Sequence, residues 1–144
     1  MIAIAQLEQT VEGFLREMDL LNEGERAHLK MLRFGSAVVM LSLHEKEDQA
    51  LCRFTSIVLK ECTPTPQLLE MILELNQEVQ MGSFLLFDDR TLAFAASIAS
   101  ETLTLERFQN ALNYVAQVAD DYDDPLQQVA GGLRAQDLLE QTEL

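Results

Sequence analysis

The spacing of the apolar residues changes along the chain, at residue 26 and again near residue 63, and this limits the folds that the chain can form. From Ile4 to Leu21 the apolar residues recur at steps of three and four, which is typical of one face of an amphipathic helix. Residues 26–34 and 50–60 have a period of two, as in strands with one buried face, and residues 36–43 between them are a nearly continuous apolar run of strand length. The chain is therefore predicted to combine helices with a sheet.

Three strands are predicted in this alternating part. Short polar segments separate them, and such short connections favour an antiparallel meander over parallel strands, which need long crossovers. The three predicted strands are residues 26–34, 36–43 and 50–60.

The second half of the chain begins with a helix start signal. In Thr63-Pro64-Thr65-Pro66 a Thr can cap a helix and a Pro suits its first turn. The helix predicted from 64 to 80 has a broad apolar face, which we expect to pack on more than one surface, and Gly82 is expected to end it. Two further strands, 83–87 and 91–98, are predicted on either side of a turn at the paired aspartates.

A last long helix is predicted from a Thr104 cap to a stop at Pro125, because the residue before a proline is biased away from helical geometry. The order α-β-β-β-α-β-β-α indicates an α+β fold, a single antiparallel sheet with helices packed against it. Residues 1–124 are predicted to form this domain, and residues 125–144 a short helical or flexible C-terminal tail.

Charge and composition exclude several kinds of partner. The 144 residues are 48% hydrophobic, enough for a domain with a core, and carry a net charge of -14. So acidic a chain is predicted to bind neither nucleic acid nor an anionic membrane surface. No apolar run is long enough to span a membrane, and the N-terminus does not look like a secretory signal. With no CxxC pair, a reduced, cytoplasmic protein is the simplest interpretation.

The candidate catalytic residues are His28, His44, Asp88 and Asp89, and no known catalytic motif accompanies them. An enzyme would need two of them to converge in a cleft with strongly perturbed pKa values. The histidines are interpreted as a surface residue and a turn residue, and the aspartates as hairpin residues. No catalytic residue is predicted.

No cofactor and no metal site is predicted either. The chain has no GxGxxG and no phosphate-binding loop. The acidic cluster 120–124 fails the calcium-loop pattern, because Leu126 and Gly132 stand where that loop needs Gly and Glu, so it is interpreted as a solvated helix end. Cys52 and Cys62 are interpreted as inert structural thiols.

The element order and the junction "LLEMILELNQEVQMGSFLLFDD", in which a helix ending in Leu75-Asn76 runs through Gly82 into a short strand and an acidic turn, point to a family. The chain resembles the type III secretion chaperone-like superfamily and, within it, the YbjN-type bacterial domains. The resemblance covers roughly residues 6–124.

This resemblance implies a non-enzymatic, chaperone-like or adaptor homodimer that binds another protein or an extended peptide segment. The implied surface is the sheet face opposite the helices, with apolar patches and sheet edges that receive a client strand. The candidate partner-binding residues are Val38, Met40, Arg53 and Thr55. Alternatively, these residues are buried in the dimer or under the N-terminal helix. The alternative function is a small-molecule-binding or regulatory domain with a pocket between the sheet and helix 64–80.

Overall fold

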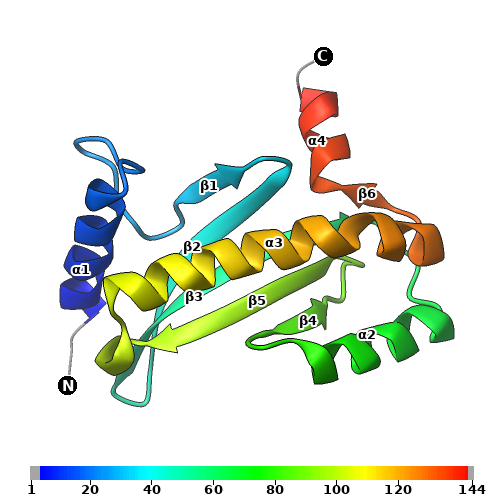
Figure 1. Ribbon diagram of the computed structural model, residues 1–144, viewed down its shortest axis with the longest axis horizontal. Helices are drawn as coiled ribbons and strands as arrows, with labels where there is room; N and C mark the ends of the chain where they lie inside the picture. The colour runs from blue at the N-terminus through cyan, green and yellow to red at the C-terminus, as the bar shows by residue number, and fades with distance from the viewer. Residues whose placement is uncertain (1–3, 143–144) are drawn as a thin grey trace.

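The computed structural model describes residues 4–142 and shows an α+β fold, one antiparallel sheet with helices packed against it (Figure 1). The predicted order α-β-β-β-α-β-β-α is confirmed, and a short strand and a short helix follow it. The elements are α1 (Ile4–Glu17), β1 (Met31–Phe34), β2 (Ala37–Lys46), β3 (Gln49–Lys60), α2 (Pro66–Glu78), β4 (Ser83–Leu86), β5 (Leu92–Ala99), a 3-10 turn (Ser100–Thr102), α3 (Leu105–Ala130), β6 (Leu133–Arg134) and α4 (Ala135–Thr142).

The strands lie in the order β1-β2-β3-β5-β4, and each described pair is antiparallel. β1, β2 and β3 form the predicted meander, and β5 lies on the other side of β3. β6 joins the sheet beyond the paired part of β2, where Arg134 lies opposite Leu59 at the end of β3. The chain therefore returns to the middle of its own sheet after the last long helix.

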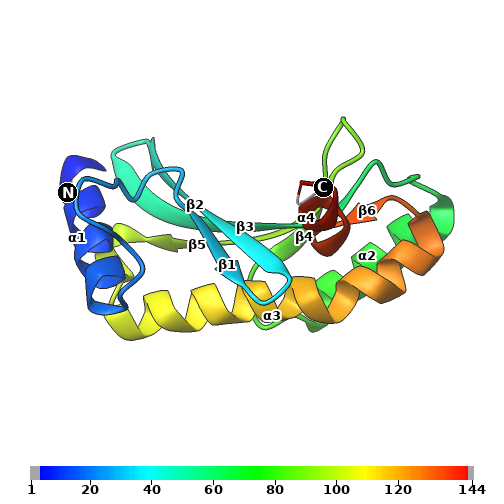
Figure 2. The same cartoon turned by 90° about the horizontal axis from the view of Figure 1, so that it is seen from above.

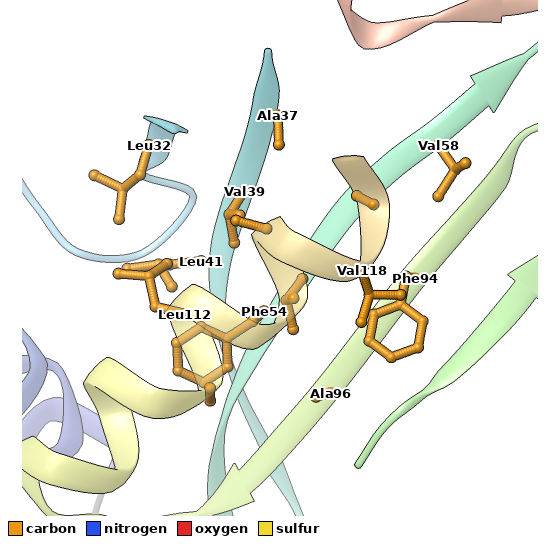
Figure 3. Close-up of a cluster of buried hydrophobic side chains, with 14 of the residues drawn as sticks. Leu32, Ala37, Val39, Leu41, Phe54, Val58, Phe94, Ala96, Leu112 and Val118 are labelled. Atoms are coloured by element: carbon orange, nitrogen blue, oxygen red, sulfur yellow. The ribbon is translucent and has the colours of Figure 1, made fainter. Parts of the chain in front are cut away.

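α3 lies across one face of the sheet, which we call the inner face, and Figure 2, the view from above, shows α3 on one side of the sheet and α4 on the other. Figure 3 shows Leu41, Phe54 and Phe94 of the strands gathered near Leu112 and Val118 of α3. Each of these five side chains is at most 6% exposed. Burying a large apolar side chain contributes about 1.5–3 kcal/mol, so this layer supplies much of the drive to fold.

α1 packs against β2, β3 and the first turn of α3. The ring of Phe108 in α3 lies 5.6 Å from the ring of Phe14 in α1 and 5.3 Å from that of Phe54 in β3, measured between centroids. Tilted aromatic pairs at such distances add to the stabilisation that burial alone gives. The three elements therefore share one aromatic cluster.

The predicted helix starts are confirmed. The Thr65 hydroxyl accepts a hydrogen bond from the backbone N–H of Leu68 at 3.2 Å, with Pro66 in the first turn of α2. The Thr104 hydroxyl accepts one from the N–H of Arg107 at 3.1 Å at the start of α3. These caps satisfy N–H groups that have no partner inside the helix. α2 ends at Glu78, before Gly82.

The predicted stop of the last helix at Pro125 is wrong. α3 continues to Ala130 and ends at Gly131, which has a positive φ of 66°. An internal proline removes one backbone hydrogen bond and clashes with the preceding turn, at a cost of about 3 kcal/mol. Leu126 and Ala130, beyond the proline, are buried in the core and offset that cost. The acidic cluster 120–124 therefore lies within a helix instead of at its end.

The first predicted strand is also too long. β1 starts at Met31, and residues 26–30 form bends and turns, with Leu29 at a φ of 62°. Ala27 is buried, whereas Leu29 is 58% exposed and Met31 is 54% exposed, so the three do not share one face. The alternation of apolar and polar residues at 26–30 therefore does not correspond to a strand.

Candidate protein-binding face

The sheet face opposite α3, which we call the outer face, carries all four candidate partner-binding residues. Met40 of β2 lies opposite Thr55 of β3, and Thr55 lies opposite Ala95 of β5. Val38 lies two residues before Met40, and Arg53 two residues before Thr55, so alternation places them on the same face. The structure thus brings the four together, while their role in binding stays a prediction.

A broad groove with a volume of about 670 Å³ runs along this face, and we call it the outer groove. Its floor includes Thr55, Ala93 and Ala95, whose short side chains leave the backbone close to the surface. Leu29 and Met40 line the groove on the β1–β2 side. The lining on the β4–β5 side includes Leu85 and Phe87.

Apolar side chains gather around the outer face. Six large apolar side chains are exposed among the described residues, and four of them, Leu29, Met31, Leu85 and Phe87, line the outer groove or the smaller pocket beside it. A concentration of exposed apolar surface on a soluble protein marks a contact site. The remaining two are on α2 and are described below.

Positive charge also gathers in the outer groove, although the chain has 24 acidic and 10 basic residues. Arg53 and Lys60 line the groove, together with two histidines, and Asp89 is the one acidic residue among the lining side chains described. The Nε of Arg53 donates to the hydroxyl of Ser97 at 3.0 Å. Among the described residues, neither Arg53 nor Lys60 forms an ion pair, so both can meet a partner's carboxylate.

The candidate catalytic residues do not form a catalytic pair. His28 accepts the backbone N–H of Leu43 through Nδ1 at 3.0 Å, and a ring nitrogen of His44 lies 2.8 Å from the hydroxyl of Ser42. Neither ring is hydrogen-bonded to a carboxylate within residues 4–142. Burial, with a smaller contribution from Arg53, lowers the pKa of His44, which keeps its ring neutral at neutral pH.

The paired aspartates serve the hairpin between β4 and β5. Asp88 and Asp89 are both exposed, and Oδ1 of Asp89 accepts the backbone N–H of Thr91 at 3.1 Å. A side chain that bonds the backbone two residues further on is a common way to stabilise a turn. The prediction that Asp88 and Asp89 form the turn of this hairpin is therefore confirmed.

The thiols and the acidic cluster offer no reactive or metal-binding arrangement in the described part of the chain. Cys52 and Cys62 are buried, and burial raises the pKa of the Cys52 thiol to about 12 and also raises that of Cys62. No group of three potential metal ligands occurs among residues 4–142. Asp120 accepts the Ser36 hydroxyl, and Asp124 pairs with Arg134, so part of the cluster makes structural contacts.

The C-terminal helix α4 lies over one end of the outer face, a contact that was not predicted from the sequence. A second pocket, of about 340 Å³, separates α4 from the sheet. Leu138 and Leu139 line it from the helix, and Val38, Met40 and Ile57 are among its lining on the sheet. The adjacent leucines at 138 and 139, with polar residues on either side, were the signal that could have revealed this contact.

α2 presents a second apolar surface. Leu68 and Ile72 are buried, but Leu69 and Leu73, one helical turn apart, are 43% and 67% exposed. Within the described chain α2 contacts both α3 and β4, as expected for its broad apolar face, while the stripe of Leu69 and Leu73 stays uncovered. None of the five pockets described for the molecule is lined by a residue of 64–80, so the proposed small-molecule pocket gains no support.

Comparison with known proteins agrees with this arrangement. The family model described as "T3SS (YopN, CesT) and YbjN peptide-binding chaperone 1" matches residues 5–138. A chain of the crystal structure of the ExsC-ExsE complex has a similar fold, with a TM-score of 0.65 and 18% sequence identity over 88% of this chain and 97% of that chain.

A search of curated protein sequences gave no significant match. Among residues 4–142, no helix is both long and apolar enough to cross a lipid bilayer. The family match extends beyond the predicted domain limit at residue 124 and includes β6 and the first half of α4. The chain belongs to the family of T3SS (YopN, CesT) and YbjN peptide-binding chaperones.

Proposed function

We propose that this protein is a non-enzymatic chaperone of the cytoplasm that holds an apolar segment of another protein in the outer groove and acts as a homodimer. The observation that carries the proposal is the position of the exposed apolar side chains. Four of six, among them Leu29 and Phe87, surround the outer face. A client that covers them removes apolar surface from water, and each Å² of apolar surface buried contributes about 25 cal/mol of favourable free energy.

The groove is a better client site than the sheet edges. Strand addition needs a row of free backbone groups along an edge. At the β4 edge, the backbone N–H and C=O of Phe84 are already bonded to the side chain of Asn76. The β1 edge is only four residues long. Side-chain contacts in the groove, with the backbone of the floor close beneath, therefore supply most of the binding.

A second copy of the chain is the proposed partner for α2. Leu69 and Leu73 lie on one stripe of this helix and have no partner surface within the described chain. They are separate from the outer groove, so dimerisation and client binding are compatible. In an antiparallel pairing of two α2 helices, each stripe meets its own copy, as a two-fold interface requires.

Site-specific photocrosslinking tests the client site. A photoreactive phenylalanine analogue replaces Phe87 at the groove, and in the matched control it replaces the exposed Gln128 on α3. We expect protein adducts in cells from position 87 and none from position 128.

The same experiment with Thr55→Arg added places a long charged side chain on the groove floor. We expect the adducts from position 87 to disappear while the protein stays folded. Equal adducts from positions 87 and 128, or adducts that persist with Thr55→Arg, would contradict the proposed site.

A further inference from the structure

We infer that α4 occupies, in the free protein, the place on the outer face that a short acidic amphipathic helix of a client takes, and that the two exclude each other. This inference rests on the proposed function, since it names the kind of client segment and adds a built-in competitor.

The two binding positions overlap. The pocket beneath α4 and the outer groove share four lining residues, Met40, Thr55, Ile57 and Lys60. Leu138 and Leu139 of α4 lie over the pocket side of this shared set. A client that reaches Met40 and Ile57 along the groove therefore meets these two leucines. Only one segment can bury the shared residues at a time.

The docking of α4 is incomplete. A volume of about 340 Å³ remains between the helix and the sheet, and Ala135, Leu138 and Leu139 are only partly buried. Side chains that face an unfilled space lose the dispersion contacts of a packed core. An eight-residue helix also has little stability of its own, so α4 depends on this contact. A client that fills the space better can displace it.

Charge indicates the character of the client. In α4 the two leucines are flanked by Asp137 and Glu140, and Glu140 shares a shallow pocket with Arg33 of β1. Lys60 lines the apolar pocket itself. Within residues 4–142, Arg33 and Lys60 form no ion pair. Asp137 is already paired with Arg134, so Glu140 is the carboxylate that faces an unpaired cation. A helix with an apolar pair followed by an acidic residue is thus complementary to this end of the face.

A polar connection keeps α4 close when its leucines leave the sheet. Arg134, the residue before α4, pairs with Asp124 of α3, and in the docked state its guanidinium also donates to the Asp137 carboxylate of α4 at 3.1 Å and 2.8 Å. β6 anchors the same segment to the end of β3. Such a tether gives a released segment a high local concentration, so α4 competes as an intramolecular ligand.

Nuclear magnetic resonance on the full-length, 15N-labelled protein tests the exclusion directly. The probe is an unlabelled peptide with the sequence of residues 133–144. We expect the amide signals of residues 135–142 to move to random-coil positions as the peptide is added, while those of Met40 and Thr55 keep the shifts of an occupied face. Peptide binding at Met40 that leaves residues 135–142 unchanged would overturn the inference.

Affinity supplies the second measurement. With a fluorescein-labelled probe, we expect full-length Leu138→Asp/Leu139→Asp to bind at least tenfold more tightly than the wild type, because its own α4 no longer competes. Gln128→Asp, an exposed change on α3 outside both pockets at α4, should bind like the wild type. Equal affinity of the double variant and the wild type overturns the inference. If the double variant does not fold, the resonance experiment on the wild type decides.

A third measurement tests whether the acidic residue of the client helix contributes to binding. A probe with lysine at the position of Glu140 should bind the double variant at least threefold more weakly, and equal binding of the two probes removes this part. Clients that crosslink through position 87 while α4 stays docked would overturn the exclusion and leave the proposed function intact. A lack of any client adduct at position 87 would instead remove the proposed function.

Discussion

The side chain of Asn76 in α2 is hydrogen-bonded to the backbone of Phe84 in β4 in both directions. The N–H of Phe84 donates to Oδ1 at 2.6 Å, and Nδ2 donates to the carbonyl oxygen of Phe84 at 3.3 Å. The side-chain amide of Asn76 therefore makes the two hydrogen bonds that the backbone of a neighbouring strand would make at this edge of the sheet. It also fixes α2 to the sheet at the junction on which the family resemblance depends.

Removing this amide should destabilise the fold. Asn76→Ala leaves a partly buried N–H and C=O of Phe84 without their partner, and such losses cost about 1–3 kcal/mol. Urea unfolding followed by circular dichroism measures the change in the free energy of unfolding. The exposed Asn113→Ala in α3 is the control and should change it by less than about 0.5 kcal/mol. Similar values for both variants would show that the amide bridge contributes little.

Gly82 should tolerate no side chain. Its φ is 74°, and a Cβ built there would lie 2.4 Å from the carbonyl oxygen of Ala95. We expect Gly82→Ala to lower the free energy of unfolding by more than about 3 kcal/mol, because backbone strain and a backbone clash add together. Gly24 has a φ of 87° and open space around it, so Gly24→Ala should cost only about 1 kcal/mol. Equal losses in the two variants would mean that the clash at Gly82 relaxes freely.

Leu73→Asp should convert the proposed dimer to a monomer. A carboxylate on the exposed stripe of α2 would be desolvated against its copy in the partner, which opposes association. Light scattering coupled to size-exclusion chromatography should give a mass near 32 kDa, twice the 16.2 kDa of one chain, for the wild type and 16.2 kDa for the variant. Gln67→Asp, an exposed change elsewhere on α2, should remain dimeric. A wild type that stays monomeric at high concentration contradicts the dimer.

The Cys52 thiol should be unreactive in the folded protein. Burial raises its pKa to about 12 from 9.0, so almost no thiolate exists at pH 8. A thiol-reactive reagent at pH 8 should label Cys52 only when the chain unfolds. Because the folded pKa lies above the unfolded one, this group's stabilising contribution is complete below pH 9 and is lost as the pH rises toward 12. Rapid labelling of Cys52 in native protein at pH 8 would contradict its burial.

Local signals predicted the element order well. The Thr-Pro signal at residues 63–66 and the cap at Thr104 are recognisable in the sequence because a cap is a property of three or four neighbouring residues, and the structure shows both hydrogen bonds, the first one at Thr65. The alternation in β3 likewise identified Arg53 and Thr55 as neighbours on one face. The same reasoning failed at Pro125, where the burial of Leu126 and Ala130 by distant strands outweighs a strong local stop signal.

The occupant of the outer face could not be predicted in this way. Periodicity indicates which side chains share a face, but it does not say which segment returns to cover that face. β6 pairs with β3 across more than seventy positions of sequence, and only this pairing brings α4 over Met40. The contact of His28 could not be predicted either. Its ring accepts a hydrogen bond from the backbone N–H of Leu43, although the sequence around His28 alternates as in a strand.

The floor of the outer groove, made by Thr55, Ala93 and Ala95, has a consequence for the range of clients. Methyl groups and a single hydroxyl have no means to read the identity of a side chain, because specific recognition depends on unmatched polar groups that penalise the wrong partner. If the groove holds a client as proposed, its floor sorts segments by width and hydropathy, while Arg53 and Lys60 in the lining favour segments that carry acidic residues. One copy of this protein would then serve several clients that share these properties and differ in the rest of their sequence.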